Sequence, residues 1–259
     1  NTHGSLSVSA NEKKKSAIQP LLPNIDFIGL NDYADLERIT EKTAGVILET
    51  IQGDAGVRQA DSTYLRALRK RCDETGALLI FDEIQCGMGR SGKMFAFEHS
   101  GVIPDILTLG KALGGGLPIG AVVASYKHLN EFSHSPILGH ITTFGGNPVI
   151  TAAACGTLEV FKNEINFNEV ERLGAILESY LHEIDEIIEI RRVGMMFACD
   201  MKSEERVATI VEKLLQDGII TFWFLSHPNS FRLSPPLNIT EALIHEVGKA
   251  IQRAVLETK

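Results

Sequence analysis

The chain has 259 residues, of which 44% are apolar and 22% are charged, as is ordinary for a globular protein of enzyme size. Asp and Glu total 33 against 25 for Lys and Arg, so the net charge is −8, which excludes a protein that coats nucleic acid or an anionic membrane through a positive field. No apolar stretch approaches the length of about 18 residues that a membrane span needs, and no signal-peptide pattern is visible at the start.

The chain contains four cysteines, and none of them forms a CxxC pair. We therefore expect neither a zinc site nor a redox motif, and no metal is predicted. Scattered thiols in a chain of this size indicate small buried side chains in a reducing compartment, which makes the cytoplasm the default location. The four are Cys72, Cys86, Cys155 and Cys199.

The first forty residues are mixed and loop-like, and the regular pattern begins with the apolar run Gly45–Ile51, which has the length of a strand. Helical spacing of apolar residues then predicts a helix that begins near Asp61 and ends at Gly76. Ala77–Asp82 is a second apolar strand. This strand–helix–strand order predicts a parallel sheet with helices on its faces.

Two further apolar runs, 106–109 and 119–123, are expected to extend this sheet, and a long helix is expected to begin after Asn147-Pro148. From about residue 165, charged amphipathic helices alternate with short strands, which predicts a second, smaller α/β domain. The division is placed at 1–160 and 161–259. The helices predicted in the second part are 169–188, 204–215 and 241–256, and the strands are 192–200, 219–224 and 230–233.

The segment Gly87–Lys93 satisfies the GxGxxG spacing and most of a phosphate-binding P-loop. A P-loop needs Ser or Thr after its lysine to reach magnesium, and Met94 stands there instead. A dinucleotide site needs a full crossover helix after the glycines, and the breakers Gly101 and Pro104 follow too soon. We interpret the segment as a surface turn, while a nucleotide-binding protein that uses it stays open as an alternative of another class.

Chemistry is indicated by an acid and a lysine at the ends of two apolar strands, Asp82 and Lys111, followed by the glycine run Gly114–Gly116. Ligands of open parallel sheets lie at the carboxyl ends of the strands, so the two side chains can face one crevice. An enzyme that uses pyridoxal phosphate needs such a pair, a lysine for the cofactor aldehyde and a carboxylate for the pyridine nitrogen. Taken one at a time, each residue would favour a plainer interpretation, a solvated loop cation for Lys111 and a helix cap for Asp82.

Several separated motifs resemble the class III pyridoxal-phosphate aminotransferases, the group that includes the ornithine and acetylornithine aminotransferases. The matching segments occur in the same order as in that family and extend over essentially the whole chain. They are Glu49–Val57, Phe81–Arg90, Pro104–Gly120, Thr142–Pro148 and Phe231–Pro236.

For the cofactor, the resemblance implies that Lys111 forms the Schiff base and moves the proton at the amino-acid Cα, and that Asp82 pairs with the pyridine nitrogen. Ile84 takes the place of an apolar residue that packs on the ring, and Gln85 that of the partner of the ring hydroxyl. Glu83, between Asp82 and Ile84, is included among the cofactor-binding residues, and Thr143 matches a threonine that reaches the cofactor phosphate of the other subunit of a dimer.

For the substrates, the resemblance implies that Arg232 holds a carboxylate, a task that suits a bidentate guanidinium. Asp54 and Thr142 are the other expected substrate-binding residues. Asp54 stands where ornithine-type members carry a Glu that pairs with this arginine, so we expect the shorter side chain to weaken or redirect that pairing. Asn1 stands where acetylornithine-type members have an arginine for the substrate α-carboxylate, which favours an ornithine- or lysine-type ω-amine donor.

The resemblance thus implies a fold-type-I α/β enzyme with a mostly parallel sheet and a smaller C-terminal α/β domain. Its expected reaction moves an amino group from an amino donor to a 2-oxo acid such as 2-oxoglutarate, in a homodimer whose sites lie at the interface. The family's main phosphate loop and stacking aromatic lie upstream of the residues present, so the sequence is expected to be N-terminally incomplete. A racemase or decarboxylase with the same cofactor stays open as the alternative within the fold.

Overall fold

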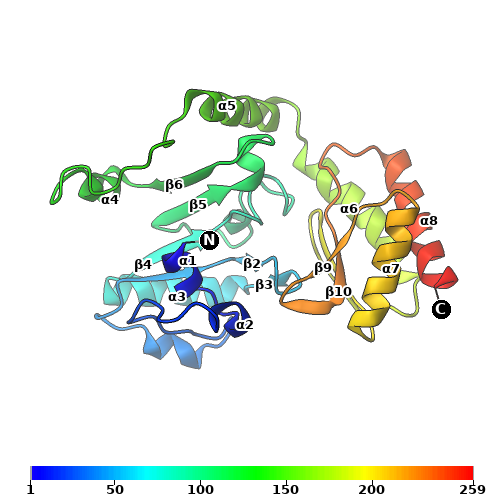
Figure 1. Ribbon diagram of the computed structural model, residues 1–259, viewed down its shortest axis with the longest axis horizontal. Coiled ribbons are helices and arrows are strands. Elements are labelled where there is room, and N and C mark those ends of the chain that lie inside the picture. Colours follow the sequence, from blue (N-terminus) through cyan, green and yellow to red (C-terminus); the bar gives the residue numbers. More distant parts are fainter. Residues whose placement is uncertain (1, 259) are drawn as a thin grey trace.

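The computed structural model describes residues 2–258, so the expectation drawn from Asn1 lies outside the described residues. Two units lie side by side, one built around the sheet of strands β1, β4, β5 and β6 and one formed by the C-terminal helices and strands (Figure 1). Of the helices in the described residues, none is both long and apolar enough to cross a membrane. The α/β class with a mostly parallel sheet, predicted above, is confirmed.

The sheet of the first unit has the order β1-β4-β5-β6, in which β1, β4 and β5 are parallel and β6 is antiparallel to β5. Parallel strands need a crossover of about a dozen residues or more, and the connection 111–119 is too short for one. The chain therefore turns back along β5. These strands are β1 (Gly45–Leu48), β4 (Leu78–Asp82), β5 (Ile106–Gly110) and β6 (Gly120–Ala124).

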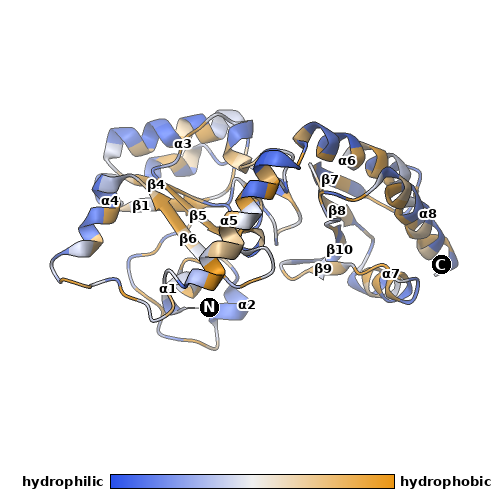
Figure 2. Cartoon of the chain, turned by 90° about the horizontal axis from the view of Figure 1, so that it is seen from above, coloured by the Kyte–Doolittle hydropathy of each residue, from blue (hydrophilic) through white to orange (hydrophobic). Residues whose placement is uncertain are grey.

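The helix α3 (Ser62–Thr75) packs on this sheet through Tyr64, Leu65, Leu68 and Cys72, all of which are buried. It ends at Gly76, whose φ of 77° lies in the left-handed region where glycine has no steric penalty. Figure 2 shows the apolar strands below this helix, whose outer side is hydrophilic. The predicted strand–helix–strand unit is present with nearly the expected bounds.

The first forty residues, predicted as loops, contain three short helices, and two small strands follow β1. The run Gly45–Ile51, predicted as one strand, is divided, because β1 ends at Leu48 and Ile51 starts a separate two-stranded hairpin. The short elements of this unit are α1 (His3–Ser7), α2 (Glu12–Lys15), η1 (Ala34–Arg38), β2 (Ile51–Gln52), β3 (Arg58–Gln59), η2 (Ala96–His99) and η3 (Lys111–Gly114).

The segment 125–147, which we call the arm, extends away from the sheet and carries α4 (Tyr126–Asn130) and η4 (Glu131–Ser133) (Figure 1). The predicted long helix follows as α5 (Pro148–Asn163), and the Asn147 side chain caps it by accepting hydrogen bonds from the backbone amides of Val149 and Ile150. Cys155 on this helix is exposed, so the prediction that all four cysteines are buried is wrong for this one, whereas the other three are buried.

The C-terminal unit contains an antiparallel sheet of order β7-β8-β10-β9 with three helices packed on one face (Figure 1). The predicted helix 169–188 ends early, at His182, and the predicted strand 192–200 is two strands joined at Gly194, where the chain reverses. The elements are α6 (Phe167–His182), β7 (Glu189–Val193), β8 (Met196–Asp200), α7 (Glu204–Gln216), β9 (Phe222–Phe224), β10 (His227–Leu233) and α8 (Glu241–Glu257).

Strand β8 is buried along its whole length because apolar residues cover both faces of its sheet. Phe197 and Cys199 face the helices, in one cluster with Phe231 of β10. Met196 and Ala198 point the other way, into a cluster that joins the two units and also contains Ile51, Val57, Cys86, Ala96 and Phe224. An apolar interface thus holds the C-terminal unit against the strand ends of the first sheet. The division at residue 160 stays a prediction, near the end of α5.

Candidate active site

Three adjacent parallel strands each lead into a charged residue at the same edge of the sheet. Glu49 follows β1, Asp82 ends β4, and Lys111 follows β5. The register pairs Leu48 with Phe81 and Asp82 with Thr108, so the three charged residues lie along one line of strand ends. The carboxyl ends of the strands therefore bring together the predicted pair and one carboxylate more.

Lys111 begins the turn that follows β5, with a φ of 43°, a conformation that side-chain-bearing residues seldom adopt. Its Nζ donates a hydrogen bond of 3.0 Å to Oε1 of Gln85. Among the described residues, no carboxylate forms an ion pair with Lys111. The amine is therefore held by a neutral partner and stays accessible at the strand edge.

Asp82 accepts a 3.0 Å hydrogen bond at Oδ1 from the backbone amide of Ile84. This bond fixes the carboxylate at the end of β4, while Oδ2 has no hydrogen-bond partner within the described part of the chain. The Ile84 side chain lies beside Gly110, where an added Cβ would stand 3.4 Å from Ile84 Cγ2. The predicted residues Asp82, Ile84, Gln85 and Lys111 are thus brought together.

Gln85 is positioned by a close approach to Gly53, in the loop after β2. A Cβ added to Gly53 would fall 2.4 Å from the side-chain amide of Gln85, so a larger residue would displace it. The glycine thereby leaves room for the amide that receives the Lys111 hydrogen bond. This contact connects the loop that carries Asp54 to the Asp82–Gln85 segment.

The side chain of Glu83 is bound to the 96–97 backbone and has no hydrogen bond to Lys111 or Gln85 in the described residues. It is buried, and its two carboxylate oxygens accept 2.7 Å hydrogen bonds from the backbone amides of Ala96 and Phe97. Burial raises the pKa of Glu83 to about 7, against these hydrogen bonds, which lower it. We therefore correct the expectation that this side chain binds a cofactor, because side chains alternate along an extended segment and the carboxylate is used to hold the 96–97 turn.

Glu49 is a site residue that the sequence reasoning did not single out. Burial raises the pKa of Glu49 to about 7, and the neighbouring Asp82 carboxylate adds to this, whereas the Gly53 backbone and the positive charge of Lys111 lower it. The signal was the same as for Asp82, an acid that closes an apolar strand. The apolar run Gly45–Ile51 predicts a single strand that passes through Glu49, whereas β1 ends at Leu48.

Asp54 and Arg232, expected to lie close together, have different partners. Oδ2 of Asp54 accepts a 2.7 Å hydrogen bond from Oγ of Ser226 and lies 3.6 Å from Nζ of Lys14, while Oδ1 accepts one of 3.2 Å from the Leu225 amide. The Arg232 guanidinium stands 5.7 Å from the centre of the Phe222 ring. No ion pair joins Asp54 to Arg232 in the described residues, so the shorter carboxylate is directed at the β9–β10 turn.

The loop that contains Asp54 is also held to the C-terminal unit by a hydrogen bond from Arg191. Arg191 donates from Nε to the Gly56 carbonyl at 2.6 Å and pairs with the Asp200 carboxylate, which Nε2 of His227 also contacts at 3.0 Å. Burial by itself would raise the pKa of Asp200, but the hydrogen bonds from Arg191 and His227 hold it below its ordinary value. The network fixes the loop between the two units.

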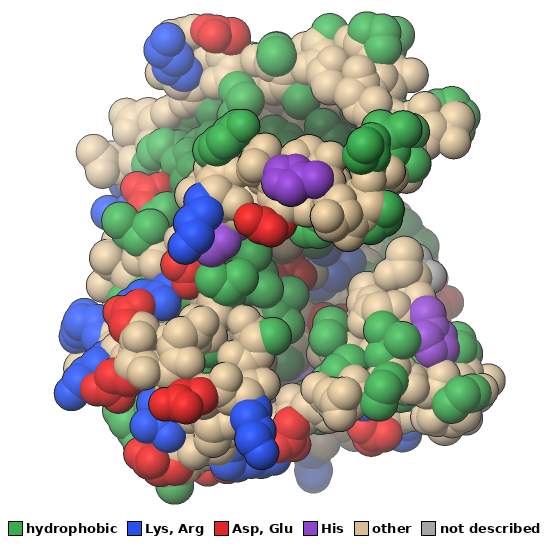
Figure 3. Space-filling model, turned by 90° about the vertical axis from the view of Figure 1, so that its left-hand side faces the viewer, with side chains coloured by type: hydrophobic (Ala, Val, Ile, Leu, Met, Phe, Trp, Pro, Cys, Tyr) green, Lys and Arg blue, Asp and Glu red, His purple; other side chains and the backbone are tan. Residues whose placement is uncertain are grey.

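Thr142 and Thr143 are exposed on the arm, and neither has a hydrogen bond to Lys111, Asp82 or Gln85 within residues 2–258. The Thr142 carbonyl accepts a hydrogen bond from the Gly145 amide, which closes a turn before α5. Large apolar side chains of the arm are exposed, among them Tyr126 at 81%, Ile137 at 79% and Phe144 at 76%. Figure 3 shows apolar side chains gathered on the upper part of the face at the arm's end of the molecule.

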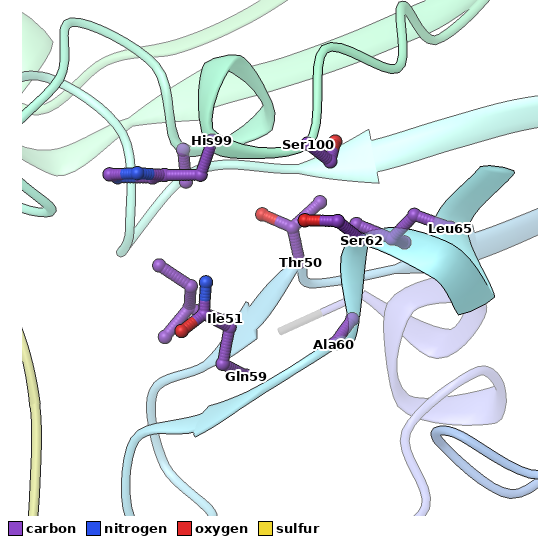
Figure 4. A pocket seen from close by; sticks show the side chains of 9 residues that line it. Thr50, Ile51, Gln59, Ala60, Ser62, Leu65, His99 and Ser100 are labelled. Carbon is purple, nitrogen blue, oxygen red and sulfur yellow. The ribbon is translucent and has the colours of Figure 1, made fainter.

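Two hollows lie elsewhere and are lined by none of the predicted cofactor-binding residues. A space of about 10 Å³ beside Thr50 and His99 has room for roughly one water molecule and is too small for a ring cofactor (Figure 4). A larger hollow of about 360 Å³ lies near Asp105 and His128, and Asp105 immediately precedes β5, at the end of that strand opposite Lys111. Neither hollow contains Asp82 or Lys111, which lie at the strand edge.

The turn Gly87–Lys93 is followed by the short helix η2 and no long helix, so the residues present lack the helix N-terminus that a dinucleotide site needs. The turn is also largely buried and not on the surface, because it is covered by the C-terminal unit. The expectation of a turn is confirmed, and its placement at the surface is wrong. Nothing in its geometry supports nucleotide binding.

Comparison with known proteins agrees with this geometry. The sequence profile of the family Aminotransferase class-III matches residues 1–255. The acetylornithine aminotransferase of Methanocaldococcus jannaschii is 39% identical and the ornithine aminotransferase 1 of Staphylococcus aureus 40% identical, over 98% and 97% of this chain. The chain spans 63% of the length of each of these relatives.

A solved structure of the ornithine aminotransferase from Toxoplasma gondii, described with partial occupancy of PLP at its active site, superposes with a TM-score of 0.91 at 32% identity. The superposition covers 99% of this chain and 61% of the other. The order of the strands, the convergence of Asp82 and Lys111 at one edge and the match over nearly the whole length lead to one conclusion. This chain belongs to the class III aminotransferases.

Proposed function

We propose that the protein that carries this chain is a pyridoxal-phosphate-dependent transaminase, which transfers an amino group from an amino-acid or ω-amine donor to a 2-oxo acid such as 2-oxoglutarate. The observation that carries the proposal is the convergence of Lys111 and Asp82 at the carboxyl ends of adjacent parallel strands. Related enzymes of both the ornithine and the acetylornithine type support it.

The residues present fit the cofactor. The Lys111 amine has only the neutral Gln85 as hydrogen-bond partner, so it is free to react with an aldehyde, and Asp82 keeps one carboxylate oxygen without a partner in the described chain. Pyridoxal phosphate, when bound, supplies an electron sink for the bond broken at the amino-acid Cα. Ile84 would pack on its ring, Gln85 would meet the ring hydroxyl, and Thr143 of a second subunit would reach its phosphate.

The roles of the protein groups follow from their chemistry. Asp82, as a carboxylate, keeps the ring nitrogen protonated, which makes the ring a better electron acceptor. With the cofactor bound, Lys111 would carry the proton between the amino-acid Cα and the cofactor, a task that suits an amine able to act as both general base and general acid. Glu49, whose pKa of about 7 lies close to the working range of a proton donor or acceptor, stands beside both groups. Arg232 orients the substrate by binding its carboxylate with two parallel hydrogen bonds.

The donor that we propose is an ω-amine of ornithine or lysine type, and not acetylornithine. Asp54 in place of Glu, together with Asn1 in place of Arg, supports this assignment from the sequence. Competition of ornithine, acetylornithine, lysine and 4-aminobutyrate, with 2-oxoglutarate as acceptor, tests it. A clear preference for acetylornithine would contradict the donor assignment alone, whereas release of carbon dioxide or racemised amino acid without a keto acid would point to the alternative reactions of this fold.

We also propose a homodimer in the cytoplasm with active sites at the subunit interface. The exposed apolar side chains of the arm and the absence of an in-chain contact between Thr143 and Lys111 in the described residues support the dimer. Complementation tests it, by mixing Lys111→Ala with Thr143→Ala subunits under conditions that exchange them. If Thr143 acts on the other subunit's site, one site of each mixed dimer is intact, and about a quarter of the full activity returns. If it acts within its own chain, none does.

The activity itself is tested with the natural protein that carries this chain, purified and supplied with pyridoxal phosphate. We expect a visible absorption band that borohydride fixes to Lys111 and the formation of glutamate from 2-oxoglutarate and an amine donor. A protein that shows neither would contradict the proposal.

A further inference from the structure

The glycine-rich turn Gly87–Lys93 is clamped between the two units of the chain. A Cβ added to Gly89, at a φ of 78°, would stand 2.7 Å from Phe161 of α5 and 2.8 Å from Leu237, which follows β10. A Cβ added to Gly194, at the turn between β7 and β8, would stand 2.4 Å from the Gly92 nitrogen. Glycine is therefore needed on both sides for the backbones to approach one another.

Arg90 at the centre of this turn bonds to the C-terminal unit through both its backbone and its side chain. Its carbonyl accepts a 3.0 Å hydrogen bond from the Met195 amide, and its Nη1 donates to the Pro235 carbonyl at 2.5 Å and to the Met195 carbonyl at 3.4 Å. No carboxylate pairs with Arg90 in the part of the chain that the structure describes. Burial without a counter-charge lowers the pKa of this guanidinium.

A largely buried guanidinium that binds carbonyls in place of a carboxylate indicates a fixed structural connection. One side of the connection is the segment from Asp82 to Gln85, since the Gly87 amide donates to the Glu83 carbonyl at 3.1 Å within the same turn. The other side is Pro235, which lies three residues beyond Arg232 at the end of β10. Arg90 thus joins the backbone that follows the Asp82–Gln85 segment to the backbone that follows β10, the strand that carries Arg232.

We propose that Arg90 is a positioning residue for substrate recognition, which sets the place of Arg232 relative to Asp82 and Lys111 by holding the Pro235 carbonyl. The inference rests on the proposed function, because Arg232 must bind the carboxylate of the 2-oxo acid for its place to matter. Lysine cannot reproduce the geometry, since its side chain is one bond shorter and its ammonium would fall short of the position of Nη1, which donates to both carbonyls.

The test uses the full-length protein loaded with pyridoxal phosphate and the variants Arg90→Lys, Arg232→Lys and the double variant. We expect Arg90→Lys to raise KM for 2-oxoglutarate about tenfold, with kcat and the cofactor absorption band nearly unchanged. In the Arg232→Lys background the same change should raise KM less than about twofold, because the group that Arg90 positions is already lost. A merely structural role would give equal effects in both backgrounds.

Arg71→Lys is the matched control, since Arg71 also donates to backbone carbonyls, those of Ile39 and Glu37, in the segment that precedes β1. It should leave KM for 2-oxoglutarate unchanged. An unchanged KM in Arg90→Lys, beside a raised KM in Arg232→Lys, would overturn the inference alone. An unchanged KM in Arg232→Lys would overturn the proposed role of Arg232 and this inference with it.

If Arg90→Lys does not fold, hydrogen exchange of the unaltered protein decides. Binding of 2-oxoglutarate should slow exchange of the Met195 amide, which donates to the Arg90 carbonyl, together with amides of 230–237. Slower exchange in 230–237 with no change at Met195 would mean that the segment carrying Arg232 is stabilised by the 2-oxo acid independently of the Arg90 turn. That result would overturn the inference.

Discussion

Nζ of Lys111 donates a hydrogen bond of 3.0 Å to the side-chain oxygen of Gln85, so the amine proposed as catalytic is held by a neutral group. The amide oxygen orients the amine, which is the group that attacks an aldehyde. Asp82, on the neighbouring strand, accepts from the Ile84 backbone. The lysine and the aspartate therefore keep separate partners within one site.

Lys111→Ala should abolish transamination, by more than about a hundredfold, because both the covalent bond to the cofactor and the proton transfer need the amine. The variant should still hold pyridoxal phosphate non-covalently, and borohydride should fix none of it. Glutamate formation and the absorption spectrum measure the two effects. Lys93→Ala, which removes an exposed lysine of the glycine-rich turn, is the control, and a comparable turnover in Lys111→Ala would exclude the assignment.

Asp82→Asn should be nearly as damaging, because an amide cannot hold the pyridine nitrogen protonated and the ring becomes a poor electron sink. Asp105→Asn is the matched control. Asp105 also accepts a hydrogen bond from a strand amide, that of Leu79 at 2.8 Å, but immediately precedes β5, at the end opposite Lys111. The Asp105→Asn variant should lower the free energy of unfolding and leave the transamination rate of the folded protein nearly unchanged. A near-normal rate in Asp82→Asn would mean that Asp82 is structural.

Arg232→Lys should raise KM for 2-oxoglutarate, since the loss of a bidentate, charge-assisted pair with a carboxylate costs about 1.5–3 kcal/mol, or roughly ten- to a hundredfold. Cofactor affinity should change little. Steady-state kinetics with varied acceptor and a cofactor titration measure the two quantities. Arg66→Lys, at an exposed position of α3, controls for the loss of a guanidinium as such, and equal effects on acceptor and cofactor would contradict the role of Arg232.

Asp54→Asn should change KM for 2-oxoglutarate by less than about fivefold, the effect of one exposed polar interaction, because Asp54 binds Ser226 and Leu225 and not Arg232. Asp54→Glu should have the larger effect, since the longer carboxylate can compete with the substrate for the guanidinium. Steady-state kinetics of both variants with varied 2-oxoglutarate measure the two KM values. A rise in KM for Asp54→Asn that matches Arg232→Lys would show that Asp54 acts on the arginine directly.

Asp200→Asn should lower the free energy of unfolding at pH 7 by up to about 3–5 kcal/mol, because it leaves the largely buried Arg191 without its main carboxylate. The pKa of Asp200 is lowered in the folded chain, so its contribution is present above the ordinary value of 3.8 and is lost as the pH falls through the lowered pKa. The difference between variant and parent should therefore shrink below pH 4. Urea titrations followed by Trp223 fluorescence measure it, and a constant difference down to pH 2 would assign the effect to packing.

The sequence by itself was sufficient for the local order of the first sheet and for its two most informative residues. Alternation of apolar runs with one helical period predicted the unit from 45 to 82, because burial on both faces of a parallel strand leaves a continuous apolar signal. Asp82 and Lys111 could be placed at one edge for the same reason, since strands of the same direction end on the same side of a sheet. The motifs in between then indicated the family.

Contacts between segments far apart in the chain were decided only by the tertiary structure. No local pattern predicts that Asp54 turns to Ser226 or that Glu83 turns inward to the backbone of Ala96 and Phe97, because each depends on which donors the folded chain brings within reach. The position of Glu49 at a strand end could not be predicted, because an apolar run does not show where one strand ends and a hairpin begins. The role proposed for Arg90 could least be predicted from the sequence, because its partners are the backbone carbonyls of Met195 and Pro235. Every residue has a backbone carbonyl, so only the packing of the folded chain decides which of them Arg90 reaches.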